Sequence, residues 1–214
     1  MQLSIQHVIP IPLKDRLASR QSGIWQSSAS FRPGEWIFIQ APSGTGKTTL
    51  IHLLYGLRTD YNGTITWDGQ PLAGMPAGNL SRLRTNDISI IFQDMRLFPG
   101  LTAWENLEAK RLLTNTVSAQ QVEEWLARLG MADKKNNSAA TLSYGEQQRI
   151  AIVRSLLQPF SWLLMDEPFS HLDNANTQKA AALIAEVVTE RKAGLILADL
   201  DTNTFFNYTK TIQL

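Results

Sequence analysis

The glycine-rich segment at residues 41–50 constrains the fold of this chain more than any other stretch. The apolar run before it, residues 36–39, has the aromatic and β-branched content of a buried strand. After it, apolar side chains recur at helical spacing: Leu50, Ile51, Leu53, Leu54 and Leu57. Gly44 and Gly46 let successive backbone N–H groups point at an anion, and the following helix adds the positive end of its dipole. We therefore interpret the segment as a phosphate-binding loop (P-loop) between a strand and a helix.

The loop also assigns chemistry to individual side chains. Lys47 would reach the β- and γ-phosphates of a nucleotide, and the Thr48 hydroxyl would hold Mg²⁺. Ala41 stands where the motif usually has its first glycine, a position at which a small residue suffices. The residues expected to contact the phosphates or the metal are Pro42, Ser43, Gly44, Thr45, Gly46, Lys47, Thr48 and Thr49.

Composition restricts the classes of function open to the chain. Its 214 residues are 43% hydrophobic and 18% charged, which is typical of a globular protein with a full core. A net charge of +1 gives no indication of nucleic-acid binding, and we expect no nucleic-acid partner. The absence of cysteine excludes disulfides and thiolate metal sites. We see no signal peptide and no run of the roughly 18 apolar residues that a membrane span needs, so any membrane role would depend on a partner.

Strand and helix patterns alternate along the chain. Residues 1–40 predict short strands with turns, an antiparallel patch that leads into the first core strand. Residues 61–69 predict turn, strand and turn in succession. A helix at 79–84, a strand at 88–92, helices within 101–130 and a polar loop at 133–141 follow. The rest predicts a helix at 143–157, a strand at 162–165, a helix at 174–191, a strand at 195–198 and a last strand ending at 214.

This order predicts an α/β fold with a mostly parallel sheet, an N-terminal antiparallel β patch and a helical subdomain insertion. We expect a single domain over residues 1–214. Its core would comprise about 1–94 and 159–214, and its helical subdomain about 95–158.

A second motif lies about 120 residues after the loop, where the apolar run 162–165 ends in Asp166 and Glu167. Acids after a strand of this kind lie at the carboxyl edge of the sheet, where ligands bind in open α/β folds. Asp166 would bind Mg²⁺ through water, and Glu167 would position or deprotonate an attacking water. An acidic pair there also favours a helix N-terminus, but after a P-loop it matches a Walker B motif.

A third motif, residues 141–149, begins a helix at Ser143, and Ser143 and Glu146 have capping-box spacing. Ser143 could therefore be only a cap. With the order of the other motifs, however, it resembles the signature of ATP-binding cassette (ABC) ATPases. Gln93 matches their Q-loop, residues 170–173 match their D-loop, and the segment from 97–99 through 105–106 matches the stretch after the Q-loop. The resemblance extends over nearly the whole chain.

That resemblance implies a P-loop NTPase that uses ATP and Mg²⁺ and works in pairs of cassettes. Ser143 and Gly145 would contact the γ-phosphate of a nucleotide held by a second cassette, in a homodimer or a heterodimer. Gln93 would contact the Mg²⁺ and the attacking water, and with Lys47 and Glu167 it completes the expected catalytic set. The implied protein is the ATPase subunit of a transport complex, peripheral on the cytoplasmic face of the cell membrane, whose helical lobe receives a transmembrane permease subunit.

The chain departs from the family pattern at three places. Leu200 stands where a switch histidine is expected, so ATP sites on this chain's own P-loop are expected to hydrolyse slowly, and the fast site of an asymmetric pair would use a partner's P-loop. Residues 14–23 contain none of the aromatics that stack on adenine, and the nearest, Trp25, is interpreted as a core residue. Tyr144 and Glu146 stand within the signature, the latter as part of the capping box.

Two other functions stay open. One is an ATP-binding switch with little turnover, which Leu200 favours and Glu167 opposes. The other is a soluble ABC ATPase of DNA repair or translation, although the long coiled-coil insertion or second cassette usual in such proteins is absent from this sequence. The motifs leave the transported substrate and its direction open.

Overall fold

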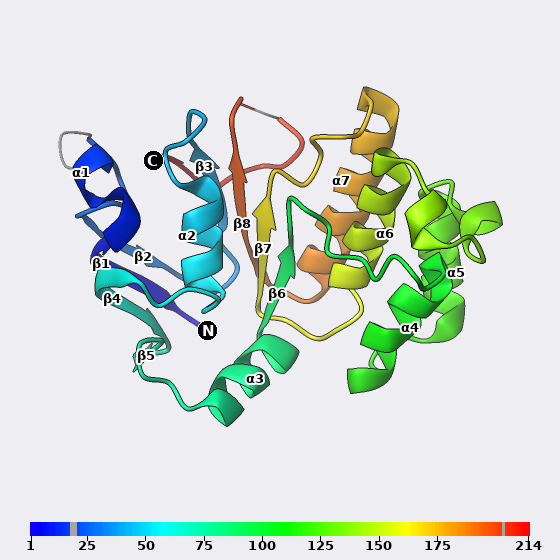
Figure 1. Ribbon diagram of the computed structural model, residues 1–214, viewed down its shortest axis with the longest axis horizontal. Coiled ribbons are helices and arrows are strands. Elements are labelled where there is room, and N and C mark those ends of the chain that lie inside the picture. Colours follow the sequence, from blue (N-terminus) through cyan, green and yellow to red (C-terminus); the bar gives the residue numbers. More distant parts are fainter. Residues whose placement is uncertain (18–20, 203) are drawn as a thin grey trace.

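The computed structural model describes residues 1–17, 21–202 and 204–214, and it confirms the predicted α/β class (Figure 1). Its larger sheet has the strand order β6-β7-β8-β3-β9, and every neighbouring pair is parallel. The strands are β3 (Trp36–Gln40), β6 (Ile88–Ile91), β7 (Trp162–Asp166), β8 (Gly194–Asp199) and β9 (Lys210–Gln213). The last strand therefore ends one residue before the predicted end at 214.

Side chains of the central strands alternate between two buried cores, one on each face of the sheet. On β3, Phe38 packs with the helices, whereas Ile37 and Ile39 pack toward the smaller sheet. The strands β7 and β8 alternate in the same way, with Leu163 and Leu195 on the helical side. Because both faces are covered, these strands are continuous apolar runs in the sequence, which is why they could be predicted.

The smaller sheet is antiparallel, in the order β2-β1-β4-β5, as expected for the N-terminal patch. It contains β1 (Leu3–Pro10), β2 (Ser28–Phe31), β4 (Tyr61–Trp67) and β5 (Gln70–Pro71). The turn predicted at the start of residues 61–69 is wrong. Gly63 lies inside β4 with φ 90°, opposite a register shift in β1 between Gln6 and Ile9, so its sequence signal reflects a bulge rather than a turn.

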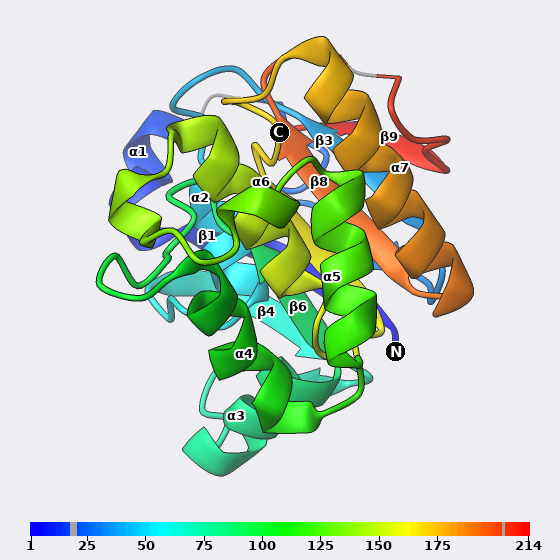
Figure 2. The ribbon, with the colours of Figure 1, turned by 90° about the vertical axis from the view of Figure 1, so that its right-hand side faces the viewer.

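The helices flank the larger sheet on both sides (Figures 1 and 2). The P-loop leads into α2 (Lys47–Leu54), and α3 (Ala77–Asn86) precedes β6. The opposite side carries α4 (Ala103–Thr114), α5 (Ala119–Arg128), α6 (Tyr144–Ser155) and α7 (Asn174–Glu190). The segment predicted as a loop at 133–141 contains two short 3-10 turns, Ala132–Lys134 and Ala139–Thr141. The boundary of a helical subdomain at about 95–158 stays a prediction.

A short helical segment before the P-loop is among the elements that were not predicted. A 3-10 turn, Ile11–Leu13, continues into the single-turn helix α1 (Lys14–Leu17), which lies beside the P-loop segment in Figure 1. Within the described ranges, no helix combines the length and apolar character needed to cross a bilayer.

A test of the packing between β7 and β8 uses two glycines. Gly194 pairs with Trp162 across the strands, and a Cβ there would lie 2.6 Å from the indole ring, which is fully buried. Gly194→Ala should therefore lower the free energy of unfolding by about 1–3 kcal/mol. Gly78→Ala, in α3 with nothing within 4 Å of the new methyl, should raise it by about 0.5–1 kcal/mol because alanine favours a helix. Urea unfolding of both variants measures the two effects, and equal destabilisation would contradict the proposed clash.

Candidate functional site

The P-loop lies at the edge of the larger sheet to which its parallel strands point, at the top of Figure 1. Gly44 and Gly46 have positive φ angles of 76° and 101°, and Gly46 is the N-cap of α2. The Thr45 side chain is buried and donates a hydrogen bond to the Pro42 carbonyl at 2.8 Å. Trp25, also buried, donates from its indole N–H to the Thr45 carbonyl at 3.1 Å. These hydrogen bonds thus hold the loop in place, and Gly44 and Gly46 adopt the left-handed backbone conformation that only glycine adopts readily.

Four predicted residues from three segments meet above this loop. The Lys47 ammonium donates to the Ala41 carbonyl at 3.0 Å and lies 3.3 Å from a Glu167 carboxylate oxygen. The Gln93 amide donates to the other Glu167 oxygen at 3.0 Å. The Thr48 hydroxyl donates to the Gln93 side-chain oxygen at 3.4 Å. The ends of β3, β6 and β7 therefore contribute to one polar network.

Asp166 lies next to this network at the end of β7 and is almost fully buried. Neither carboxylate oxygen has a hydrogen-bond partner among the described residues. Burial raises the pKa of Asp166 to about 6, against the lowering effects of Thr48 and Lys47. Buried carboxylate oxygens without partners, beside the hydroxyl of Thr48, form a donor set that suits a hard divalent cation.

The network borders a cavity of about 300 Å³. Six of the eight predicted loop residues line it, together with Gln93 and Glu167. Pro42 and Thr45 are absent from its wall because they bond to each other within the loop. Two lining residues were missed by the sequence analysis, Leu13 and Arg16, which belong to the 3-10 turn and α1. Neither residue belongs to a sequence motif, so only the fold shows that they lie beside the P-loop.

The residues predicted to act on a second cassette lie elsewhere. Ser143 and Gly145 line a separate hollow that shares no residue with the P-loop cavity. The predicted capping box forms: the Ser143 hydroxyl accepts from the Glu146 N–H, and the Glu146 carboxylate accepts from the Ser143 N–H. A Cβ at Gly145 would lie 2.8 Å from the His171 carbonyl, so this position requires glycine.

The wall of this hollow carries two rings. Tyr144 is 67% exposed, and its ring centroid lies 5.3 Å from that of His171 in the predicted D-loop. The exposed Tyr144 ring therefore leaves this side of the hollow open to contact with another molecule.

Gln148, on α6, was also missed as a connecting residue. It is buried, its amide donates to the Glu167 carbonyl at 3.3 Å, and its side-chain oxygen accepts from the His171 N–H at 2.9 Å. A glutamine on an otherwise apolar helix face was the available signal, because buried polar groups need partners. It joins the helix that begins at Ser143 to the acid of the P-loop network.

The structure also places the other two departures from the family pattern, Leu200 and the missing aromatic residue. Leu200 is 40% exposed and directly follows Asp199, whose carbonyl accepts from the Ala41 N–H at the start of the loop at 3.0 Å. Trp25 is a core residue, as predicted. Of the segment 14–23, residues 18–20 lie outside the described residues.

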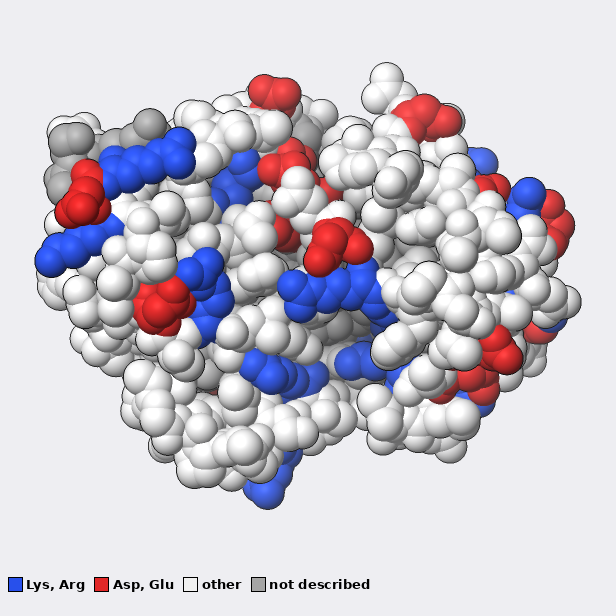
Figure 3. All heavy atoms as spheres, viewed as in Figure 1, with Lys and Arg blue, Asp and Glu red and all other residues white. Residues whose placement is uncertain are grey.

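Lys and Arg side chains gather in the middle of the face in Figure 3, where the surface is hollowed. A groove there, with a volume of about 350 Å³, lies between the sheet and α4. Its wall combines Tyr55, Phe92, Phe98 and Leu113 with the cations Lys110 and Arg154. Burial lowers the pKa of Arg154 to about 10, and burial followed by repulsion from Arg154 lowers that of Lys110.

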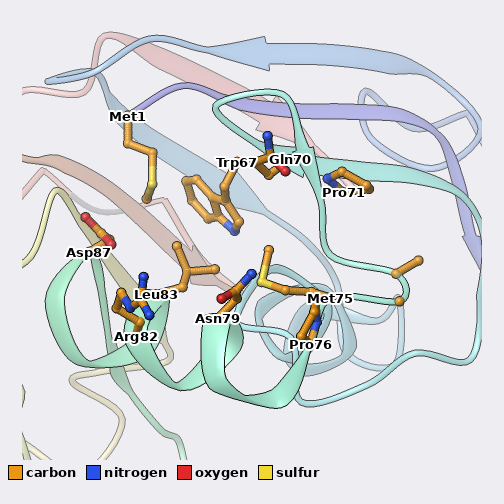
Figure 4. Close-up of a pocket in the computed structure, with 12 residues that line it drawn as sticks. Met1, Trp67, Gln70, Pro71, Met75, Pro76, Asn79, Arg82, Leu83 and Asp87 are labelled. Atoms are coloured by element: carbon orange, nitrogen blue, oxygen red, sulfur yellow. The ribbon is translucent and has the colours of Figure 1, made fainter.

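Another cavity, of about 390 Å³, lies between the β4–β5 hairpin and α3 (Figure 4). The side chains of Trp67, Met75 and Leu83 line it and point toward one another, and Arg82 extends from α3. It shares no lining residue with the P-loop cavity and lies outside the candidate site.

Comparison with known proteins gives one family. The family model described as ABC transporter matches residues 25–170. The methionine import ATP-binding protein MetN of Corynebacterium efficiens is 39% identical over 166 residues, 76% of this chain and 46% of that protein. The macrolide export ATP-binding/permease protein MacB of Marinobacter nauticus is 32% identical over 158 residues, 72% of this chain and 24% of that protein. The matched part is thus less than half the length of these curated relatives.

Solved structures match the fold. A dimeric structure of MJ0796, described as a bacterial ABC transporter cassette, has a TM-score of 0.79 and 24% identity over 93% of this chain and 88% of that one. A dimeric structure of the same cassette in a post-hydrolysis state, with ADP and Pi, has a TM-score of 0.76 with the same identity and coverage. These two structures show that the fold is shared, and nothing beyond the fold is concluded from them.

The burial of Asp166 leads to a stability prediction. Its pKa of about 6 in the folded protein exceeds the value of about 3.9 for an unfolded aspartate, so the protonated form favours folding. This contribution is complete below about pH 4 and is lost as the pH rises through about 6. Asp166→Asn, which stays neutral, should raise the free energy of unfolding on the order of 1–3 kcal/mol at pH 8 and leave it unchanged near pH 4. Urea unfolding without divalent cations measures this difference.

The control is Asp133→Asn, which removes an exposed carboxylate that is in no ion pair among the described residues and should leave the free energy of unfolding unchanged at both pH values. An Asp166→Asn variant no more stable than the unsubstituted protein at pH 8 would show that the buried carboxylate carries no such cost.

Proposed function

This chain belongs to the ABC transporter family of ATP-binding cassettes, and on that premise we propose that it binds and hydrolyses ATP as a subunit of a membrane transport complex. The observation that carries the proposal is the network of Lys47, Glu167, Gln93 and Thr48 at the edge of the P-loop cavity. It unites a phosphate-binding cation, an acid and an amide within hydrogen-bonding reach of one another. ATP hydrolysis requires these groups together.

Each member of the network has a separate task. The P-loop N–H groups and Lys47 bind the phosphate oxygens. A bound γ-phosphate competes with Glu167 for Lys47, whose ammonium has three donors and can keep its bond to Ala41. Glu167, still held by Gln93, then orients an attacking water and accepts its proton. Gln93 thereby links the water to the segment that leads into the helical lobe.

Mg²⁺ fits the residues beside the network. The unpartnered oxygens of Asp166 and the hydroxyl of Thr48 would hold it, with Gln93 nearby. When bound there, Mg²⁺ would neutralise charge that develops on the phosphates. Burial raises the pKa of the Asp166 carboxyl, and a cation held there would offset the cost of ionising it.

A second cassette completes the site in this proposal. Ser143 is exposed and Gly145 is half-buried at the N-terminus of α6, where N–H groups and the helix dipole favour an anion. They line a hollow separate from the P-loop cavity of their own chain, which supports action on a nucleotide held by another copy or by a related cassette. The dimeric state of the MJ0796 structures agrees with this arrangement.

The groove between the sheet and α4 suits a permease segment. Its aromatic and aliphatic wall, with Phe98 58% and Leu113 68% exposed, offers an apolar contact area. The partly buried cations Lys110 and Arg154 would attract an acidic side chain or the C-terminal end of a helix. An amphipathic segment of a transmembrane subunit, at the cytoplasmic face of the membrane, could supply both the apolar surface and the acidic group that this groove suits. The names of the relatives, which concern import and export, favour transport over DNA repair or translation.

Leu200 favours a second candidate function for this chain. It directly follows Asp199, whose carbonyl accepts from the N–H of Ala41 at the start of the loop, and its side chain cannot donate a hydrogen bond to a phosphate. Sites on this chain's own P-loop are then slow, and in the extreme case the chain is an ATP-binding switch whose closure, not its turnover, drives the complex.

The first test removes the proposed base. Glu167→Gln should lower ATP turnover by about 10²- to 10⁴-fold, because general-base catalysis contributes that much, while ATP binding persists. The variant should also accumulate as an ATP-dependent dimer, measured by size-exclusion chromatography with light scattering. A switch with little turnover would show the dimer but no change in an already low rate.

A second substitution in the Glu167→Gln background tests the shared site. Ser143→Arg adds bulk at the expected contact and should abolish the dimer. Ser118→Arg, at the N-cap of α5, removes a comparable helix cap away from that hollow and should leave the dimer intact. Absence of a dimer at any ATP concentration would exclude a homodimer and indicate a different partner cassette.

The second test restores a donor at Leu200. Leu200→His should raise turnover by about 10-fold or more, because one missing transition-state donor costs about 10²- to 10³-fold. Leu200→Ala, which adds no donor, should leave turnover unchanged. An unsubstituted protein that already turns over at about 10 s⁻¹, a typical enzyme rate, and gains nothing from histidine would contradict the idea of a slow site.

A further inference from the structure

The single-turn helix α1 carries a cation over the P-loop. Leu17 is buried in the core below it, and the preceding turn is anchored by a hydrogen bond from the Ile11 N–H to the Asp60 carbonyl at 2.9 Å. Leu13 and Arg16 are three residues apart, so they share one face, and both line the P-loop cavity. The backbone that carries Arg16 is therefore anchored next to the loop.

The Arg16 guanidinium lies directly against the loop glycine. A Cβ built at Gly44 would meet the guanidinium nitrogens Nη2 at 2.5 Å and Nη1 at 3.3 Å. Gly44 belongs to the turn whose N–H groups bind phosphate. Within residues 1–17, 21–202 and 204–214, no carboxylate or carbonyl pairs with Arg16. Its charge is thus available to a ligand of the cavity.

The cation of the loop does not offer its charge to a ligand alone. Lys47, the cation of the loop itself, lies 3.3 Å from Glu167 and shares its charge with that carboxylate. A triphosphate is strongly anionic, and the planar fork of arginine can bind two phosphate oxygens at once. Arg16 stands where such a contact is made without displacing a partner.

The base, in contrast, finds little to stack on. No aromatic side chain lines the cavity among the described residues. The Trp25 ring lies 3.2 Å from the Cβ position of Gly46, but it is buried and its N–H is bonded to the Thr45 carbonyl, so it supports the loop instead. Leu13, 3.1 Å from the same position, offers only an apolar contact.

We propose that Arg16 is a phosphate clamp: a cation outside the P-loop that binds the phosphate chain of the nucleotide from α1, so that affinity depends on the phosphates more than on the base. The inference rests on the proposed function, since it concerns the same nucleotide. It names a specificity-determining residue that the P-loop, Walker B and signature motifs do not contain.

The test compares three ligands with Mg²⁺ by isothermal titration calorimetry: ATP, GTP and inorganic tripolyphosphate. Arg16→Ala should weaken all three by a similar factor of about 10- to 100-fold, the effect of losing charge-assisted hydrogen bonds. Arg16→Lys should recover part of the loss because it keeps the charge but not the fork. Lys14→Ala, which removes an exposed cation from the same helix but outside the cavity, should change none of the affinities.

The possible outcomes distinguish failure of the Arg16 proposal from failure of the proposed ATP-binding function. Unchanged or tighter binding by Arg16→Ala, with Lys47→Ala binding none of the ligands, would overturn the clamp and leave the ATP site standing. Weaker ATP and GTP binding with unchanged tripolyphosphate binding would assign Arg16 to the base or sugar and would also overturn it. An unsubstituted protein that binds none of the three ligands would remove both proposals.

Discussion

The contact between the Lys47 ammonium and the Glu167 carboxylate joins the loop after β3 to the end of β7, although β8 lies between these strands in the sheet. It can form only if the three strands end at one edge and in one register, with Gln40 beside Asp199 and Asp166 beside Ala198. A slip of one residue would turn every side chain to the opposite face. The register is fixed by the apolar side chains that alternate between the two cores, so the packing of the sheet determines the geometry of the site.

This geometry is held at a cost to stability. Asp166 is buried without a hydrogen-bond partner among the described residues, and Glu167 has a positive φ of 45°, which is strained for a residue with a side chain. The backbone of Glu167 is fixed on two sides, by its N–H to the Ala198 carbonyl at 3.0 Å and by the Gln148 amide to its own carbonyl. Because Gln148 belongs to α6, a short chain of hydrogen bonds connects the helix that carries Ser143 to the proposed catalytic acid and the P-loop site.

Local signals predicted the parts of the molecule whose shape is decided locally. The continuous apolar runs gave β3, β7 and β8, the spacing of Ser143 and Glu146 gave the capping box, and the glycines gave the loop. Errors arose where a local signal had a non-local cause: the glycine at 63 serves a bulge opposite β1, not a turn. Arg16 and Gln148 carried almost no signal, because their roles depend on which segments the fold brings beside them. The phosphate contacts of the loop residues stay predictions, since they depend on a ligand rather than on the chain.

If two cassettes form each ATP site, Leu200 and Ser143 of one chain would affect two different ATP sites. Lys47, Asp166, Glu167 and Leu200 would act on the nucleotide bound by their own chain, whereas Ser143 and Tyr144 would act on the nucleotide of the partner. A missing donor at Leu200 then slows only the first site, while the hollow beside Ser143 retains its helix N-terminus and its essential Gly145. In a homodimer both ATP sites would lack this donor, whereas in a heterodimer only the site on this chain's P-loop would lack it.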